Sequence, residues 1–107
     1  MSRILLVITL FLAVAGCSHL ASNDGDVVYL CTSGERPVAS YPSPETAALS
    51  YRGEQHRLDR VRSGSGERYA DDKFVWWTKG DEASLIAIEN DGSMGKRLET
   101  CHVANGK

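Results

Sequence analysis

The sequence predicts an all-β fold, a small eight-stranded antiparallel β-barrel. Eight short segments rich in β-branched and aromatic residues recur at spacings of about ten residues, turn residues separate them, and none has the length and periodicity of a confident helix. Cysteines in the first and the last of these segments would join the two ends of the sheet by a disulfide. Closure of the barrel would also remove the exposed edges that an open sheet presents.

The chain begins with a segment typical of a bacterial lipoprotein signal peptide. Arg3 supplies a positive charge, a mostly apolar stretch of 12 residues covers positions 4–15, and small residues precede Cys17. Such a stretch is too short to cross a bilayer of about 30 Å, so it favours a cleaved signal. We expect cleavage after residue 16 and lipid chains on Cys17 that anchor the protein in the membrane. Ser18 directly after the cysteine resembles the sorting pattern of outer-membrane lipoproteins, so we expect the domain to face the periplasm. The alternative is a soluble secreted protein.

One small domain would remain after cleavage. Residues 17–107 number 91, the length of a single domain. The polar stretch 17–26 is expected to be the lipidated N-terminus and a flexible tether, which leaves 27–107 for the barrel. Loss of Arg3 leaves 11 basic against 14 acidic side chains, a net charge of −3. This charge argues against a nucleic-acid partner and mildly favours a basic one.

The strands follow in order from residue type. Segments rich in Val, Ile, Tyr and Trp alternate with turns that contain Gly, Pro, Asn and Asp. The expected strands are 27–32, 36–41, 47–51, 56–62, 67–69, 73–78, 82–88 and 96–103. The third has an alternative, because residues 45–49 could equally form a helical turn. Trp76 and Trp77 must face opposite sides of one strand, and the sequence does not indicate which of them is buried.

Two cysteines remain as a pair once Cys17 is set aside. An oxidising compartment favours a disulfide between Cys31 and Cys101. Closing a loop of about 70 residues would stabilise the fold by roughly 4 kcal/mol on the chain-entropy model. A zinc site of both cysteines with His56 or His102 is the alternative, but it lacks closely spaced ligands. No metal or cofactor is therefore expected.

Residues 63–80 carry the strongest indication of function. A Ser-Gly-Ser-Gly loop at 63–66 is followed by Lys79, 14 positions after Ser65, with an expected strand between them. On a hairpin layout, we expect both side chains in loops, free to point outward. The segments SGSG-x-x-Y at 63–69 and W-x-K-G at 77–80 resemble the bacterial membrane-bound and periplasmic inhibitors of c-type lysozyme. That family has an eight-stranded antiparallel barrel.

The resemblance implies a non-enzymatic protein that binds c-type lysozyme and so protects peptidoglycan from host or competitor enzymes. The family's loop serine and its lysine, which match Ser65 and Lys79, enter the lysozyme cleft. A lysine ammonium suits the ionised carboxylate there, and a serine hydroxyl can hydrogen-bond to the neutral carboxylic acid. Glycines beside them would leave room in a narrow cleft and permit positive φ angles. The candidate lysozyme-binding residues are Ser65, Lys79, Gly64, Gly66, Tyr69 and Gly80.

Two other classes of function stay open. An envelope lipoprotein could use the same barrel as a structural element or for a small apolar or glycan ligand, although a barrel of this length has little internal room. A hydrolase is disfavoured because residues 64–66 lack the G-x-S-x-G spacing of a nucleophile elbow. No histidine is placed by the sequence as the base that such an enzyme would need.

Overall fold

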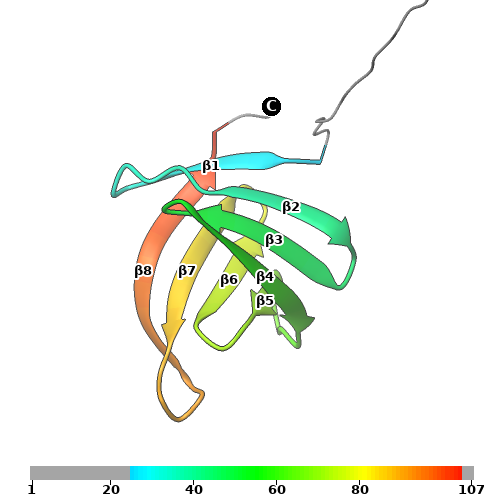
Figure 1. Cartoon of the computed structure of the whole chain (residues 1–107), viewed down its shortest axis with the longest axis vertical. Helices are drawn as coiled ribbons and strands as arrows, with labels where there is room; N and C mark the ends of the chain where they lie inside the picture. The colour runs from blue at the N-terminus through cyan, green and yellow to red at the C-terminus, as the bar shows by residue number, and fades with distance from the viewer. Residues whose placement is uncertain (1–24, 105–107) are drawn as a thin grey trace, which may run out of the picture.

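The all-β prediction is confirmed. The computed structural model describes residues 25–104, which form a closed antiparallel barrel (Figure 1). Neighbouring strands in the sequence pair with each other, and the first pairs with the last to close the ring. The strands of this region are β1 (Val27–Cys31), β2 (Val38–Ser43), β3 (Thr46–Tyr51), β4 (Glu54–Val61), β5 (Glu67–Ala70), β6 (Phe74–Lys79), β7 (Glu82–Ile88) and β8 (Met94–Val103).

The expected signal segment, the lipidated Cys17 and most of the expected tether lie outside the described residues. Cleavage after residue 16 and lipidation therefore stay predictions. Within residues 25–104, no helix is long and apolar enough to cross a membrane.

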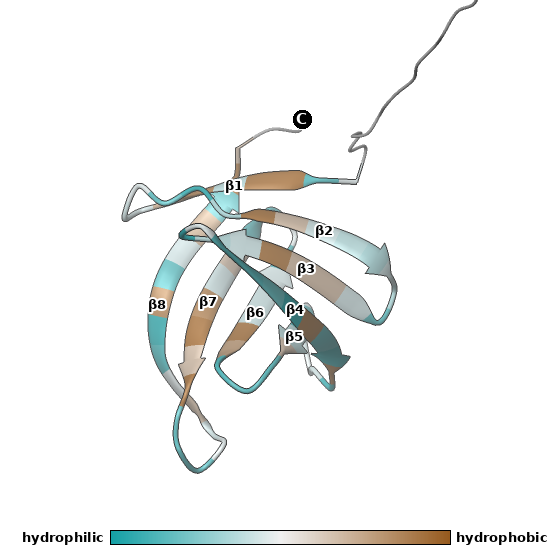
Figure 2. Ribbon diagram, in the orientation of Figure 1, coloured by the Kyte–Doolittle hydropathy of each residue, from teal (hydrophilic) through white to brown (hydrophobic). Residues whose placement is uncertain are grey.

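Side chains alternate along each strand between the interior and the surface, and this alternation builds the core. Along β3, Ala47, Leu49 and Tyr51 belong to the buried core. Figure 2 shows hydrophobic and hydrophilic stretches along the strands. Trp76 is fully buried, and Tyr29 packs edge-on against it with 5.0 Å between the ring centroids. The buried member of the tryptophan pair is therefore Trp76.

Strand boundaries differ from the expected ones where prolines and turns intervene. The second strand runs to Ser43 and includes the exposed Pro42, because a register shift between Ser40 and Ser43 interrupts the pairing with β3 there. The third segment is a strand and not a helical turn.

The expectation that Lys79 lies in a loop is wrong. Lys79 is the last residue of β6 and pairs with Glu82 of β7. The intervening turn has only two residues, Gly80 and Asp81, so the pairing of β6 with β7 continues up to the turn. Lys79 is nevertheless exposed.

Connections alternate between the two ends of the barrel, as antiparallel pairing requires. One end, which we call the loop end, carries the β2–β3 connection, the β4–β5 loop at 62–66 and the β6–β7 turn. A backbone hydrogen bond from Arg60 N to Glu45 O (2.8 Å) ties the β2–β3 connection to β4, and one from Val103 N to Asp81 O (2.8 Å) ties the β6–β7 turn to β8. The first and last described residues lie at the same end, where Ala104 N donates to Val28 O (2.7 Å).

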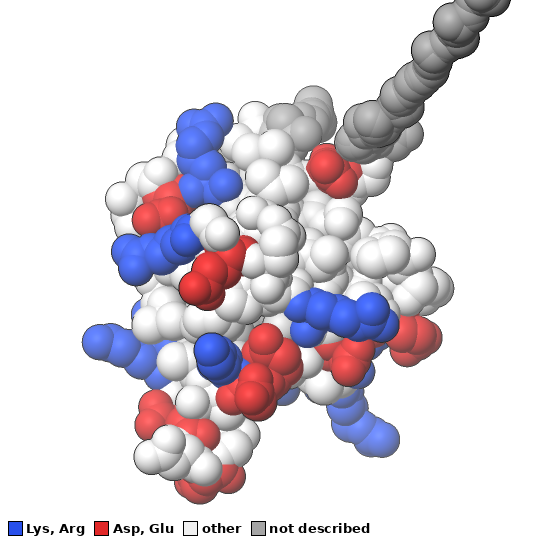
Figure 3. Space-filling model, viewed as in Figure 1, with Lys and Arg blue, Asp and Glu red and all other residues white. Residues whose placement is uncertain are grey.

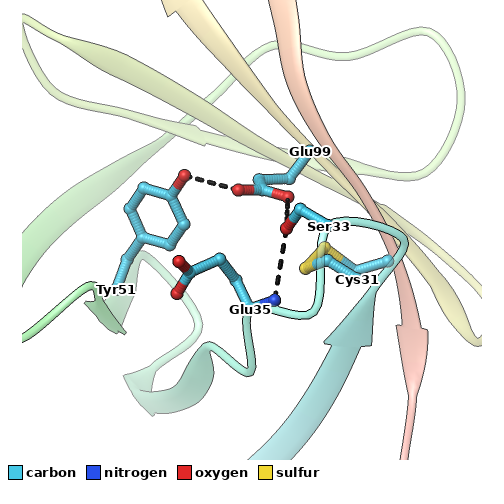
Figure 4. The surroundings of a disulfide bond; sticks show 6 residues. Cys31, Ser33, Glu35, Tyr51 and Glu99 are labelled. Carbon is cyan, nitrogen blue, oxygen red and sulfur yellow. Dashed lines mark hydrogen bonds between the residues drawn. A yellow bond between two sulfur atoms is a disulfide. The ribbon is translucent and has the colours of Figure 1, made fainter.

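The predicted disulfide between Cys31 and Cys101 is confirmed and joins β1 to β8. Beside it, the buried Glu99 accepts hydrogen bonds from Tyr51 Oη (2.6 Å) and Ser33 Oγ (2.7 Å), as Figure 4 shows. Two hydroxyl donors offset much of the cost of burying a carboxylate. Both thiols are oxidised, and within residues 25–104 the single cluster with metal-ligand spacing is Cys31, Glu99 and Cys101. The zinc alternative is therefore wrong.

Candidate functional site

Ser65 and Lys79 both lie at the loop end of the barrel. The β4–β5 loop, residues 62–66, leads into Glu67, which pairs with Thr78 next to the end of β6. Ser65 is exposed, and its backbone carbonyl accepts hydrogen bonds from Trp77 Nε1 (2.9 Å) and Ser63 Oγ (2.5 Å). The structure thus places both residues that the sequence motif singled out at the loop end, and the Ser65 backbone is bonded to the strand that carries Lys79.

Gly66 forms the contact between the loop and Lys79. A Cβ added at this position would lie 2.3 Å from both Lys79 Cγ and the Thr78 carbonyl oxygen. Its φ of +64° is also a conformation that residues with side chains rarely adopt. Glycine is therefore required at position 66 for two separate reasons.

The other two candidate glycines have different roles. Gly80 has a φ of +57° in the two-residue turn after Lys79, as the sequence argument expected. Gly64 is not in the positive-φ region, so the conformational part of that argument is wrong for it. A Cβ on Gly64 or on Gly80 would meet no atom within 4 Å, so both positions leave open space beside the exposed side chains.

Trp77 lies on the outer face of β6 and contacts two cationic side chains. It pairs with Arg68 of β5, whose guanidinium carbon is 4.1 Å from the centroid of the indole ring. Lys79 Nζ is 5.9 Å from the same centroid. These distances are those of cation–π contacts. Trp77 belonged to the motif in the sequence, whereas nothing in the sequence singled out Arg68, since its role depends on strand register.

Tyr69 differs from the other candidates because only 3% of it is exposed and its ring is part of the core. Its hydroxyl donates to Glu67 Oε1 (3.0 Å), and Glu67 Oε2 lies 3.5 Å from Arg60 Nη2. Burial, together with the hydrogen bond to Glu67, raises the pKa of Tyr69 to about 12. Tyr69 therefore supports the first residue of β5 from inside the barrel.

The mouth of the barrel at the loop end is concave. A pocket of about 600 Å³ opens there, and Tyr29, Tyr41 and Tyr69 contribute to its lining. Trp76 Nε1 donates to the Tyr41 hydroxyl (3.2 Å), and burial raises the pKa of Tyr29 well above its usual value. Sequence reasoning missed this aromatic mouth, because which tyrosines meet depends on pairing between distant strands.

Charge on the surface is mixed. Over the face of the barrel in Figure 3, acidic and basic side chains are interspersed. The described surface therefore presents no broad field of one sign on this face.

Comparison with known proteins identifies the family. The family described as "Membrane-bound lysozyme-inhibitor of c-type lysozyme" matches residues 29–94, a range that contains both Ser65 and Lys79. Two curated relatives carry the name "Membrane-bound lysozyme inhibitor of C-type lysozyme". One, from Yersinia enterocolitica, is 29% identical over 72 residues, and one, from Cupriavidus necator, is 32% identical over 78 residues. These matches cover 67% and 70% of this chain, and each covers 62% of the relative, somewhat less than two thirds of its length.

A solved structure has the same fold. It is the crystal structure of Pseudomonas aeruginosa MliC in complex with hen egg white lysozyme, which superimposes with a TM-score of 0.56 at 26% sequence identity. The similarity covers 84% of this chain and 98% of the other. Because the family match spans more than half of this chain, the chain belongs to the family of membrane-bound lysozyme inhibitors of c-type lysozyme.

Proposed function

We propose that this protein is a non-enzymatic inhibitor of c-type lysozyme, and that its β4–β5 loop and Lys79 enter the active-site cleft of the enzyme. The observation that carries the proposal is the contact between the loop and Lys79 through Gly66, which places the exposed Ser65 and Lys79 at one end of a closed barrel. Membership of the family supports it, as does the likeness to a relative solved in complex with hen egg white lysozyme.

The chemistry of the two side chains suits the lysozyme cleft. A retaining lysozyme uses one neutral carboxylic acid and one ionised carboxylate, on opposite sides of the bond that it cleaves. The Lys79 ammonium would pair with the carboxylate, and the Ser65 hydroxyl would hydrogen-bond to the acid. Substrate would then be excluded from both catalytic groups without any covalent step.

The remaining candidates would act around these two. Gly64 and Gly80, with open space where a Cβ would stand, would allow the cleft walls to approach Ser65 and Lys79 closely. Gly66 would hold the loop against β6. Tyr69 would act from within, through its hydrogen bond to Glu67 at the base of the loop.

Anchoring at the outer membrane, with the barrel in the periplasm, is the second part of the proposal. Its support is the Cys17 motif of the sequence and the name of the family, which is membrane-bound. A Cys17→Ser variant should lose incorporated palmitate and signal processing. Label retained in the membrane fraction would contradict the lipid anchor.

Inhibition of hen egg white lysozyme in a peptidoglycan lysis assay tests the function directly. We expect the parent protein to inhibit at micromolar concentration or below, and the double variant Ser65→Ala/Lys79→Ala to inhibit far less. Lys73→Ala is the matched control, because Lys73 is an exposed lysine in the β5–β6 turn at the opposite end of the barrel. Absence of inhibition by the parent would contradict the function and favour a ligand-binding envelope lipoprotein. Full inhibition by the double variant would contradict only the cleft-insertion mechanism and not the inhibitor function.

A further inference from the structure

Trp77 contacts both halves of the proposed lysozyme-binding site. Its indole N–H donates to the Ser65 carbonyl oxygen (2.9 Å), and its ring lies beneath the ammonium of Lys79, 5.9 Å from centroid to Nζ. Trp77 is therefore the side chain through which the loop and the lysine, 14 residues apart, are held together.

Arg68 also contacts the Trp77 ring. Its guanidinium carbon lies 4.1 Å from the Trp77 ring centroid, from the paired position on β5. Among the described residues, Arg68 Nε is the one buried side-chain nitrogen or oxygen without a hydrogen-bond partner. A buried donor left unpaired costs free energy. Arg68 Nε thus has no hydrogen bond to offset its burial, and the contact of the guanidinium that the structure shows is the one with the indole.

The core does not need Trp77 for its packing. The fully buried Trp76 fills the interior, whereas Trp77 is half-buried on the outer face and is not part of the core cluster. Replacing its N–H would therefore open no cavity in the barrel.

We propose that Trp77 and Arg68 are positioning residues that order the Ser65 loop and Lys79 before lysozyme is bound, an inference that rests on the proposed function. A Ser-Gly-Ser-Gly segment is intrinsically flexible, and ordering it on binding would weaken the complex. In the free protein, Trp77 Nε1 and Ser63 Oγ already donate to the Ser65 carbonyl. The loop therefore loses less conformational freedom when it enters a cleft.

Trp77→Phe and Trp76→Phe form a matched pair of variants. Each variant removes one indole N–H. Trp77→Phe loses the hydrogen bond to the Ser65 carbonyl, and Trp76→Phe loses the hydrogen bond to the Tyr41 hydroxyl. In the protein purified from membranes in detergent, we expect Trp77→Phe to raise the inhibition constant for hen egg white lysozyme about 3- to 10-fold, as loss of one neutral hydrogen bond would. Its melting temperature should stay near that of the parent. Trp76→Phe should lower the melting temperature and leave the inhibition constant within about twofold of the parent value.

Arg68 provides a second measurement. Arg68→Gln removes the cation over the ring and should weaken inhibition by about 2- to 5-fold, whereas Arg68→Lys keeps a cation there and should restore most of it. Equal inhibition by Arg68→Gln and the parent would overturn the role of Arg68.

Hydrogen exchange of the amides of residues 63–66 in the free protein separates this inference from the proposed function. We expect faster exchange in Trp77→Phe than in the parent and in Trp76→Phe. Unchanged exchange, or unchanged inhibition by Trp77→Phe, would overturn the positioning role while inhibition by the parent still stood. If the parent protein did not inhibit lysozyme at all, the proposed function would be contradicted. The positioning role in lysozyme binding would then be contradicted too, even if amide exchange were faster in Trp77→Phe.

Discussion

Replacing Lys79 by alanine is the sharpest test of cleft insertion. In the free protein Lys79 is exposed, and its Nζ makes one cation–π contact at 5.9 Å from the Trp77 centroid. Exposed contacts of this kind contribute about 0.5 to 1 kcal/mol, so folding should lose little. In the complex the ammonium would be desolvated beside a carboxylate, and loss of such a contact costs about 2 to 4 kcal/mol of binding. We therefore expect the inhibition constant to rise about 30- to 1000-fold.

Two measurements on the same preparations separate binding from folding. Lysis of peptidoglycan by hen egg white lysozyme gives the inhibition constant, and thermal unfolding followed by circular dichroism gives Tm. A loss of 1 kcal/mol lowers Tm by about 4 to 8 °C in a domain of this size, so the Lys79→Ala variant should fall by no more than that. The Lys73→Ala control should match the parent in both. Unchanged inhibition by Lys79→Ala would refute the ammonium–carboxylate contact, and a Tm loss large enough to explain weak inhibition would assign the effect to folding.

Three further outcomes follow from the geometry. Gly66→Ala should weaken inhibition and lower Tm, because the added Cβ would lie 2.3 Å from two neighbouring atoms and the residue has a φ of +64°. Gly64→Ala should change Tm little, because there is open space around that position. Equal Tm values for the two variants would contradict the packing argument. Reduction of the Cys31–Cys101 bond should lower Tm substantially, since closing a loop of this length stabilises by roughly 4 kcal/mol, and mass spectrometry after alkylation without reductant should find neither thiol free. The pKa of Tyr69 in the folded protein is about 12, above its ordinary value of 10. The contribution of its neutral hydroxyl to stability is therefore complete below pH 10 and is lost as the pH rises toward 12. Between pH 10 and pH 12, the Tm of Tyr69→Phe should fall less than that of the parent.

Most of the fold could be predicted because strand signals are local. Alternating apolar residues and turn residues located all eight strands, and the cysteine pair indicated where the ring closes. Boundaries were less predictable, because they depend on partners far away in the sequence. Pro42 lies inside β2 since a register shift with β3 accommodates it, and neither strand alone carries a signal for that shift.

The sequence indicated the exposed side chains of the candidate site but not the residues that pack against them. Ser65 and Lys79 stood out because a Gly-rich loop and a lysine before glycine are visible in one chain segment. Arg68 did not, since its contact with Trp77 arises only when β5 and β6 pair in one register. The buried position of Tyr69 likewise depends on the closed barrel around it.

The spacing between serine and lysine in the motif is a consequence of hairpin register. Glu67 pairs with Thr78, so extending the ladder by one step sets Gly66 opposite Lys79, and by two steps sets Ser65 opposite Gly80. The close approach of the Gly66 backbone to Lys79 Cγ is what this extension requires. A side chain at position 66 would force the loop away from β6, and Ser65 would lose its hydrogen bond from Trp77. The glycine, the tryptophan and the lysine of the two short segments are therefore parts of one packing arrangement, which holds the backbone of the exposed Ser65.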